Sequence, residues 1–337
     1  MRVLTWNIKN GGGDRLPSII KVIDQARPDV VTLQELQGFH RYGGRRLREL
    51  AAALDMTAHL APSVLAQPVA VLVREPLRIV RRARISWRLH HAAAVAVVPT
   101  PAGPLTVVSA HLNPFSPYRR MREARWLAAR HATPNGLTLI AGDMNGLAPP
   151  HNPNPQASAV DTNPPTPAVD TSGPAPAGVA SGPSPAGVAS GLDPAGVASG
   201  PSPAGVGNGP SPAGVASGPS PAGVANSLDP AGDHTAALAG LPALYRKRHL
   251  GPDGRPDTRA LAAFREEGFV DLWHTVGSGD GHTVPTAYAG HEFAPVRLDY
   301  LLASPPLAAR AQHLRVIRDD LTAQASDHYP LLADLDL

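Results

Sequence analysis

The sequence of 337 residues predicts an α/β sandwich, in which helices lie outside mixed β-structure. Two observations support this prediction. Short apolar runs of strand length alternate with segments whose apolar residues recur at helical spacing. In the first half of the chain, several strand-like runs follow one another without a helix between them, which means that at least part of the sheet is antiparallel.

Strands are expected where an apolar run is bounded by Pro, Gly or polar residues. In chain order these runs cover residues 2–8, 29–35, 69–73, 78–87, 93–98, 105–111, 137–141, 296–303, 313–317 and 330–335. Helices are expected at residues 17–27, 45–54, 117–130 and 258–267. Pro17 and Pro117 suit a first helical turn, and Ser116 and Asp257 suit an N-cap.

Residues 151–233 interrupt this pattern. They hold 17 of the 38 Pro and 14 of the 32 Gly, no Lys, Arg or aromatic residue, and a nine-residue repeat that most often reads SGPSPAGVA. Stacked repeats would bury too little apolar surface to offset roughly 1–2 kcal/mol per ordered residue. We therefore expect a disordered insertion at 151–233, while residues 1–150 and 234–337 together form one catalytic domain. The repeat is either a tolerated expansion of a surface loop or a docking or spacing element.

Composition narrows the class of protein. Five of the 27 acidic residues and none of the 30 basic ones fall in the insertion, so the remaining 254 residues carry a formal charge of +8, which suits a polyanionic substrate. The absence of Cys excludes a disulfide scaffold, a thiol nucleophile and a Cys-ligated metal. With no long apolar run and no signal-like start, we expect a monomer in the cytoplasm without stable membrane insertion.

Polar side chains end or interrupt several of the apolar strands. They are Asn7, Glu35, His111, Asp143 with Asn145, Asp299, and the Asp327-His328 pair before the last strand. A carboxylate or amide at the end of a strand points into a loop-lined cleft. Inside an apolar strand Asp299 would need a partner to stay charged, and His328 is the obvious candidate.

These residue types suit phosphoester chemistry. Carboxylates and amides without Cys favour a hard cation such as Mg²⁺ or Mn²⁺, which Glu35 could hold. Hydrolysis of a phosphodiester needs a positioned water, for which Asp143 is a candidate, and donors to the phosphoryl oxygens. Four side chains could be those donors: Asn7, Asn145, His111 and His328. Taken singly, each of these residues is more often a solvated strand edge or a turn.

In chain order the motifs TWNI, LQE, SAHL, GDMN, RLDYLLAS and SDHYPL resemble the endonuclease/exonuclease/phosphatase superfamily. This group holds DNase I-like nucleases, exonuclease III-like AP endonucleases, inositol polyphosphate 5-phosphatases and neutral sphingomyelinases. The resemblance covers the chain up to about residue 145 and from about residue 258. It implies a four-layered α/β/β/α sandwich of two mixed sheets flanked by helices, with the active site at one edge among the strand ends.

The resemblance also implies roles around a metal and a water. Glu35 would be the principal Mg²⁺ ligand, Asn7 would help to hold phosphate or metal, and Asp327 would lie at or near the metal. Asp143 would position the attacking water, and Asn145 would bind the phosphoryl group.

His111 would contact phosphate, as in the DNase I and sphingomyelinase branches of the family. Asp299 would pair with His328, fix its tautomer and favour the imidazolium that stabilises the pentacovalent state. RLDYLLAS and SDH look like the exonuclease III branch, but the DNA-gripping insertions of that branch are not recognisable, so specificity for abasic sites is not supported.

Three basic clusters bear on the substrate. The cluster after His111 begins with Arg119 and Arg120, which are expected to bind phosphate; the others, at residues 41–48 and 246–248, suit either a phosphate backbone or a solvated helix face. The leading hypothesis is a Mg²⁺-dependent nuclease that cuts DNA or RNA by in-line attack of an activated water. The alternatives are a phosphatase or phospholipase-C-like enzyme acting on a small phosphate ester or lipid headgroup, and a non-catalytic binding protein of the same fold.

Overall fold

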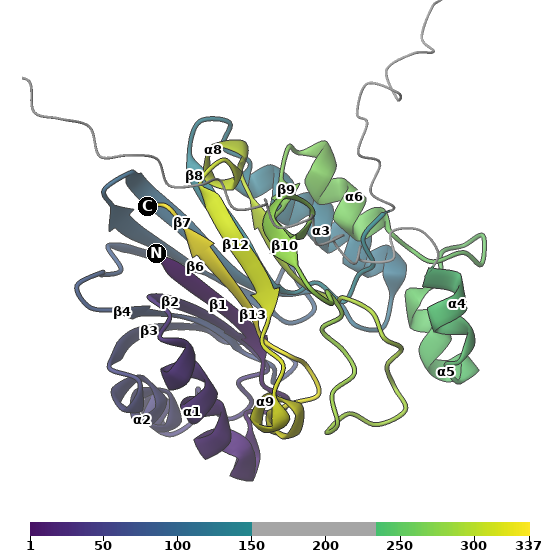
Figure 1. Cartoon of the computed structure of the whole chain (residues 1–337), viewed down its shortest axis with the longest axis horizontal. Coiled ribbons are helices and arrows are strands. Elements are labelled where there is room, and N and C mark those ends of the chain that lie inside the picture. The colour runs from purple at the N-terminus through teal and green to yellow at the C-terminus, as the bar shows by residue number, and fades with distance from the viewer. Residues whose placement is uncertain (150–233) are drawn as a thin grey trace, which may run out of the picture. The chain divides into compact units, whose positions relative to one another are not determined.

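Two mixed β-sheets with flanking helices form the part of the chain that the computed structural model describes, residues 1–149 and 234–337 (Figure 1). This confirms the predicted α/β fold. The predicted insertion at residues 151–233 lies outside the described residues.

The first sheet has seven strands. Their order across the sheet is β10 (Gly277–Ser278), β12 (Ala311–Val316), β13 (Leu331–Leu335), β1 (Arg2–Asn7), β2 (Val30–Gln34), β4 (Val69–Arg74) and β3 (Met56–Ala61). Strands β1 and β2 are parallel because α1 (Leu16–Ala26) connects them, whereas β13 and β4 flank this pair in antiparallel orientation.

The second sheet has six strands and, like the first, contains a parallel pair of strands connected through a helix. Their order is β5 (Arg81–Ile85), β6 (Ala92–Thr100), β7 (Gly103–His111), β8 (Leu137–Asp143), β11 (Asp299–Ala303) and β9 (Val270–Asp271). Here the parallel pair is β7 and β8, joined through α3 (Pro117–His131), with antiparallel neighbours on either side. Each sheet therefore brings the carboxyl ends of two parallel strands to one edge, where the polar residues of the predicted site lie.

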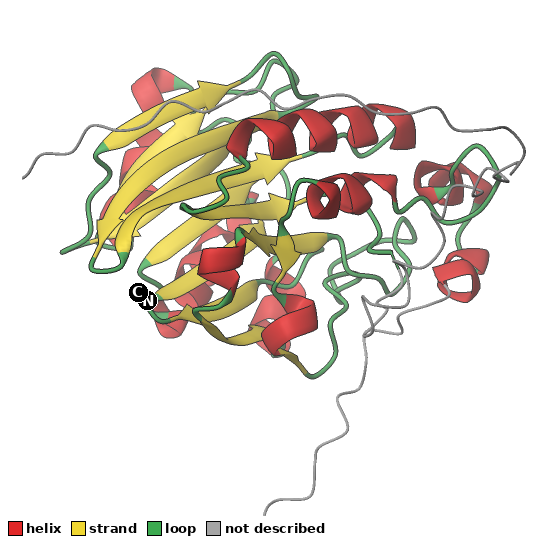
Figure 2. Cartoon of the chain, turned by 90° about the horizontal axis from the view of Figure 1, so that it is seen from above, coloured by secondary structure: helices red, strands yellow, loops and turns green. Residues whose placement is uncertain are grey.

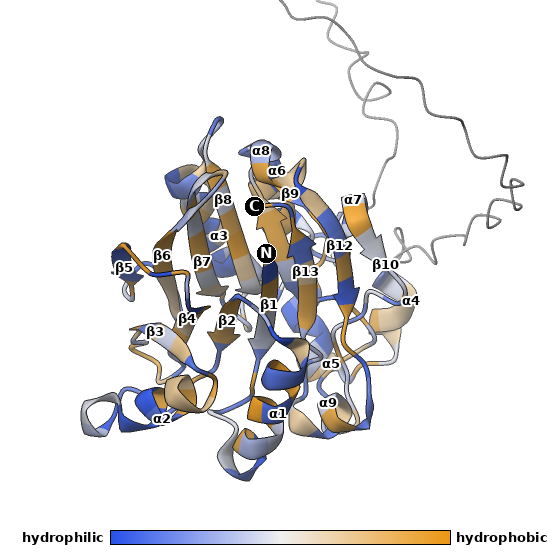
Figure 3. Cartoon of the chain, turned by 60° about the vertical axis from the view of Figure 1, so that its left-hand side comes forward, coloured by the Kyte–Doolittle hydropathy of each residue, from blue (hydrophilic) through white to orange (hydrophobic). Residues whose placement is uncertain are grey.

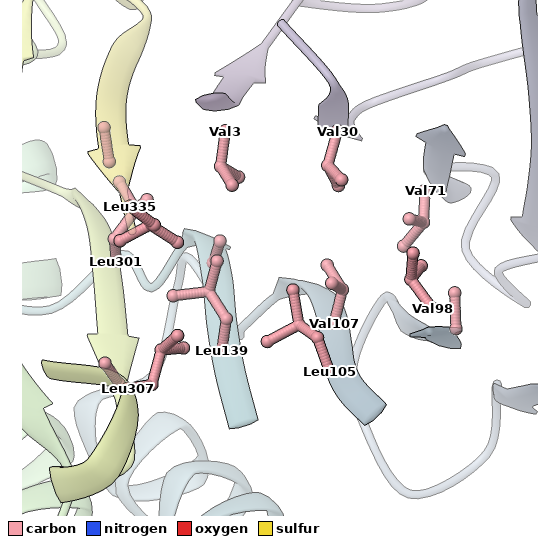
Figure 4. Packing of buried hydrophobic residues seen from close by; sticks show 14 of the residues in the cluster. Val3, Val30, Val71, Val98, Leu105, Val107, Leu139, Leu301, Leu307 and Leu335 are labelled. Carbon is pink, nitrogen blue, oxygen red and sulfur yellow. The ribbon is translucent and has the colours of Figure 1, made fainter. Parts of the chain in front are cut away.

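The sheets pack face to face over one apolar cluster. Val3 and Val30 from the first sheet meet Val107 and Leu139 from the second (Figure 4). The next residue along each strand points the opposite way, so Leu4 packs against helices instead. Because both faces are covered, these strands read as nearly continuous apolar runs (Figure 3).

Helices cover the two outer faces, and Figure 2 shows them on both sides of the strands. Apolar residues of α1, α2 (Arg45–Ala53) and α9 (Asp320–Ala325) pack on the seven-stranded sheet. Those of α3 and α6 (Arg259–Glu266) pack on the six-stranded sheet. The remaining helices are short: α4 (His234–Ala239), α5 (Ala243–Arg246), α7 (Trp273–Val276), α8 (Pro305–Ala308), η1 (Gly13–Arg15), η2 (Tyr42–Gly44) and η4 (Lys247–His249).

The structure corrects several predicted boundaries. The expected strands at residues 78–87 and 296–303 are shorter, and β3, β9, β10, α4, α5, α7, α8 and α9 were not predicted. Ser116 caps α3 as expected, with its hydroxyl 3.4 Å from the Arg119 amide. In α6 the N-cap is Thr258, and the Asp257 carboxylate instead accepts from the Arg259 amide at 3.0 Å. Among the helices of the described residues, none has the length and apolar character needed to cross a bilayer.

Candidate active site

Three polar residues stand in register across the six-stranded sheet. His111 ends β7, Asp143 ends β8 and Asp299 begins β11, and their Cα atoms pair in sequence from one strand to the next. Registered residues on neighbouring strands point to the same face of a sheet, so the three side chains converge. Each is at most 2% exposed. We call these three residues the catalytic row.

The close approach of β7 and β8 depends on Gly142, directly before Asp143. Its φ of 144° lies in the range that favours glycine, and a Cβ atom there would lie 2.0 Å from the carbonyl oxygen of Ala110. The glycine of the GDMN motif is therefore required for the register that brings Asp143 beside His111.

His328 faces two carboxylates of the catalytic row. Its Nδ1 lies 2.8 Å from Asp299 Oδ2 and its Nε2 lies 3.8 Å from Asp143 Oδ2. The indole of Trp6 donates to the His328 carbonyl at 2.8 Å and holds the segment in place. Burial lowers the pKa of His328, but the charges of Asp299 and Asp143 outweigh it and raise this pKa to about 10. The ring is thus an imidazolium at neutral pH, with Nδ1–H donating to Asp299.

Asp143 collects donors on both carboxylate oxygens. The amide of Asn145 donates to Oδ1 at 2.9 Å and Asn7 Nδ2 donates to Oδ2 at 3.0 Å, while His111 Nε2 lies 3.4 Å from Oδ2. Burial raises the pKa of Asp143 to about 7, although the charge of His328 acts in the opposite direction. A carboxyl group with this pKa suits a general base that works near neutral pH.

Asn7 links the two sheets at the site. Its Nδ2 lies 3.0 Å from Glu35 Oε1 as well as from Asp143 Oδ2, so one amide group joins the end of β1 to the loop after β2 and to β8. The Asn7 oxygen accepts from the Lys9 amide at 3.0 Å. In this arrangement the Asn7 amide nitrogen orients two carboxylates. That Asn7 helps to hold phosphate or metal, as the family resemblance implies, stays a prediction.

Glu35 has an unusual backbone conformation. Its φ of 59° is left-handed, a conformation that costs energy in residues other than Gly or Asn and that clusters at functional sites. Its Oε2 accepts from the Asn10 amide at 3.0 Å and from Gln67 Nε2 at 3.3 Å. Burial raises the pKa of Glu35, and the nearby charge of Asp327 raises it further. The loop geometry thus places two acidic groups close together at a considerable electrostatic cost.

Lys9 lies beside these acids and was not predicted. Its ammonium is 2.7 Å from Asp327 Oδ2 and 3.2 Å from Glu292 Oε1. The only signal in the sequence is that Lys9 follows directly after the TWNI motif. Burial lowers the pKa of Lys9, but its contacts with Asp327 and Glu292 raise it overall, so a fixed positive charge offsets part of the acidic cluster.

The side chains present fit a divalent cation. The donor atoms of Asp143, Asp299 and His328 lie within 4.8 Å of one another, which makes them a possible metal site. As an imidazolium, however, His328 has no lone pair to offer, so in that state only the two carboxylates can face a cation. Asp299 Oδ1 is buried and has no hydrogen-bond partner among the residues that the structure describes, and the pKa of Asp143 is raised by burial. A cation beside these carboxylates, with Glu35 as its expected ligand, would offset their negative charge and stabilise the carboxylate form of Asp143. Oxygen donors without thiolates are typical of sites for hard cations, and Mg²⁺ or Mn²⁺ stays a prediction from the sequence.

Arg119 and Arg120, the two arginines predicted to bind phosphate, differ in their exposure to solvent. Arg119 is exposed at the start of α3, but Arg120 is only 1% exposed. The Arg120 guanidinium donates to the carbonyl oxygens of Asn113 at 3.0 Å and Arg248 at 2.8 Å. The prediction that Arg120 binds phosphate is therefore corrected: this buried side chain joins two loops.

Three more residues near the row were missed: His90, His91 and Glu123. The ring of His91 stacks on that of His111 with centroids 4.2 Å apart, and the ring of His90 meets His91 edge to face at 4.5 Å. Glu123 of α3 accepts from the amides of His90 at 2.7 Å and Asn113 at 2.8 Å. Burial lowers the pKa of His91 to about 3 and that of His111 well below its ordinary value, so both rings are neutral.

A buried His–Asp pair beside a second carboxylate, at the edge of two packed mixed sheets, defines a phosphoesterase site of the metal-dependent type. A family model described as the Endonuclease/Exonuclease/phosphatase family matches residues 4–328. The chain belongs to this family and is a metal-dependent phosphoesterase. No curated protein sequence matches the chain significantly.

Solved structures share the fold at low sequence identity. An endonuclease/exonuclease/phosphatase family protein from Leptotrichia buccalis C-1013-b matches with a TM-score of 0.56 and 13% identity over 100% of both chains. An endonuclease/exonuclease/phosphatase from Beutenbergia cavernae DSM 12333 matches with a TM-score of 0.56 and 19% identity over 100% of this chain and 71% of that one. A mannosyl-6-phosphatase from Bacteroides thetaiotaomicron VPI-5482 matches with a TM-score of 0.53 and 12% identity over 100% of both chains.

Proposed function

We propose that this phosphoesterase is a Mg²⁺-dependent nuclease that hydrolyses a phosphodiester of DNA or RNA by in-line attack of water. The observation that supports the proposal most directly is the position of Asp143, which lies between the imidazolium of His328 and the amide of Asn7. A base and two donors around one point can hold a water and a phosphoryl oxygen together.

The charge state of each side chain determines its role in the proposed reaction. Asp143, with its pKa raised to about 7, accepts the proton of the attacking water. His328, held by Asp299, presents a positive N–H at Nε2 to the phosphoryl group as negative charge builds up there. Neutral His111 can donate from the other side of Asp143. Glu35 and Asp327 would hold Mg²⁺, which when bound supplies positive charge to the phosphoryl oxygens and the leaving oxygen.

The choice of a nucleic acid rests on charge. The chain outside residues 151–233 has a formal charge of +8. The exposed Arg119 and Arg122 lie on α3, and the loop that leads into this helix begins after His111. Cationic side chains beside a phosphoesterase site suit a substrate with several phosphates.

A small phosphate ester is the second candidate. The catalytic row contacts only the reacting phosphate in the proposed mechanism, so it does not select the leaving group. The mannosyl-6-phosphatase of similar fold shows that this architecture also occurs in a sugar phosphatase. Lipid headgroups belong to the same alternative.

A parallel assay separates these candidates. Purified protein with Mg²⁺ is given plasmid DNA, RNA, an abasic duplex, mannose 6-phosphate, inositol phosphates and sphingomyelin. We expect cleavage of DNA or RNA, lost in Asp143→Asn and retained in the control Asp24→Asn, an exposed acid of α1. Release of inorganic phosphate from the small esters, with nucleic acids left intact, would contradict the nuclease proposal.

A further inference from the structure

Aromatic rings and arginines gather on one exposed surface beside the catalytic row. Trp87 is 75% exposed, Phe115 is 56% exposed and Tyr118 is 57% exposed. Guanidinium groups lie over these rings: Arg88 at 4.3 Å from the Trp87 ring, Arg122 at 5.8 Å from Tyr118 and Arg248 at 5.2 Å from Phe115. We call these six residues the Phe115 surface.

The surface joins segments that are distant in the sequence. Trp87 and Arg88 come from the segment between β5 and β6, Phe115 from the loop before α3, and Arg248 from η4 after the insertion. Two of the predicted basic clusters, at residues 119–125 and 246–248, are thereby brought together, which their sequence separation did not suggest.

A buried network holds the three segments in place. Glu123 accepts from the amides of His90 and Asn113, and Arg120 donates to the carbonyls of Asn113 and Arg248. Both side chains project from the buried side of α3 and are at most 8% exposed. Fixed backbone at these points gives the exposed rings a defined arrangement, as a recognition surface requires.

Aromatic contacts connect this surface to the catalytic row. The ring of Phe115 meets His90 edge to face at 5.5 Å, His90 meets His91 at 4.5 Å, and His91 stacks on His111 at 4.2 Å. His111 in turn lies 3.4 Å from Asp143. The Phe115 surface is therefore joined to the catalytic row by a continuous series of ring contacts.

We propose that the Phe115 surface binds single-stranded nucleic acid, whose unpaired bases stack on Trp87 and Phe115 while Arg88, Arg122 and Arg248 contact its phosphates. This inference rests on the proposed nuclease function and specifies its substrate. Exposed rings with guanidinium groups beside them offer stacking partners for unpaired bases and cations for the phosphates of the same strand. In a duplex the bases are paired inside the helix, so the exposed rings would have no base to stack on.

The first test measures binding without catalysis. Wild-type protein in EDTA is titrated with fluorescent oligothymidylate, oligouridylate and a hairpin duplex. We expect tighter binding of both single strands than of the hairpin, quenching of tryptophan fluorescence that is lost in Trp87→Leu, and a logarithmic salt dependence whose slope falls by about 0.7 for each phosphate-contacting arginine removed. Equal binding of hairpin and single strand would overturn the inference, as would binding only to phosphatidylserine vesicles.

The second test uses catalysis and a matched control. Phe115→Leu and Trp87→Leu remove a ring but keep apolar bulk, and Tyr42→Leu changes a ring that is 89% exposed in η2. For each, kcat/KM is measured with oligothymidylate and with the small diester bis-p-nitrophenyl phosphate. We expect a fall of about tenfold or more in the ratio of the two values for the first two variants, and none for Tyr42→Leu. An unchanged ratio in Phe115→Leu and Trp87→Leu would overturn the inference.

The outcomes distinguish this inference from the proposed function. Cleavage of duplex and single strand at equal rates would leave the nuclease proposal standing and remove the single-strand preference. Absence of cleavage of every nucleic acid, with hydrolysis of small esters retained, would remove both. Thermal midpoints of all variants identify any change that arises from unfolding.

Discussion

The catalytic row and the Phe115 surface lie side by side but are built in opposite ways. The row is buried, is formed by residues in register on adjacent strands, and has its acidic charge compensated by His328. The surface is exposed and is assembled from loops that a helix holds together. We infer that the row provides the rate of the reaction and the surface provides affinity for the substrate, so mutations in the two regions should affect different kinetic constants.

The largest effect is expected at Asp299 of the row and its partner His328. His328→Ala and Asp299→Ala should each lower kcat by about three orders of magnitude or more with little change in KM, because the transition-state donor is lost. The double variant should be little worse than either single one, because the two side chains form one unit through a 2.8 Å contact. Single-turnover cleavage measures both points, and additive losses would show that the pair does not act as a unit.

The pH dependence follows from the same residues. Asp143 must be deprotonated to accept a proton, so kcat/KM should rise with pH up to about 7, or to a lower pH when a bound cation stabilises the carboxylate. His328 must stay protonated, so activity should persist until the pH approaches 10. A profile that falls between pH 7 and 8 would contradict the proposed role of His328.

The next largest effect should come from changing Arg120, whose side chain holds together two of the segments that carry the Phe115 surface. Arg120→Met leaves the buried carbonyls of Asn113 and Arg248 without their donor and should lower the free energy of unfolding by about 2–4 kcal/mol. Arg130→Met, at an exposed position of the same helix, is the matched control. Chemical denaturation measures both. Equal stabilities would mean that Arg120 does not hold the loops together.

Buried neutral histidines make a smaller, pH-dependent contribution. Burial and the charges of Arg120 and Arg248 lower the pKa of His249, beneath the surface, from 6.5 to about 3. Between these values the unfolded chain binds a proton that the folded chain does not, so stability should fall as pH falls below about 6.5, by up to about 1.4 kcal/mol per pH unit. His249→Gln should flatten the dependence of the thermal midpoint on pH in this window, whereas the exposed control His313→Gln should not.

The smallest predicted effect is a difference in substrate binding between arginine variants of α2 and of α3. In α2, Arg45 pairs with Glu49 at 2.7 Å, and Arg46 donates to the Gly11 carbonyl at 3.1 Å. In α3, Arg122 is exposed and lies over Tyr118. Arg122→Gln should raise KM for oligothymidylate a few-fold and reduce its salt dependence, and Arg45→Gln should do neither. Equal effects would mean that overall charge, and not the surface, attracts the substrate.

The sequence predicted the strand ends of the site because a polar residue directly after an apolar run is a local signal. Asn7, Glu35 and Asp143 stand at such ends, whereas Asp299, which was expected inside the strand at residues 296–303, begins β11. The same argument failed for β3, whose MTAHLA segment mixes polar and apolar residues at the edge of a sheet. It also failed for α9, although Asp319 and Thr322 form a capping box that the sequence displays.

The Asp299–His328 pair was predicted, but other contacts between distant segments could not be. His91 contacts His111, and Lys9 contacts Asp327, only because the fold brings these segments together. The position of Arg120 did carry a usable signal. It precedes Glu123, Ala124, Leu127 and Ala128 on one face of α3, and this spacing indicates a buried stripe rather than a phosphate-binding face. Because arginine is usually exposed, Arg120 was not expected to belong to this buried stripe.

The central claim is that a divalent cation held by Glu35 is needed for cleavage of single strands. It is tested most directly by measuring how cleavage depends on this cation and on this residue. Wild-type protein, Glu35→Gln and the exposed control Glu267→Gln are compared in single-turnover cleavage of oligothymidylate over a Mg²⁺ titration and in EDTA. We predict Mg²⁺-dependent cleavage by the wild type and Glu267→Gln, and loss of cleavage at ordinary Mg²⁺ concentrations in a folded Glu35→Gln. Full turnover by Glu35→Gln, or by the wild type in EDTA, would contradict the account.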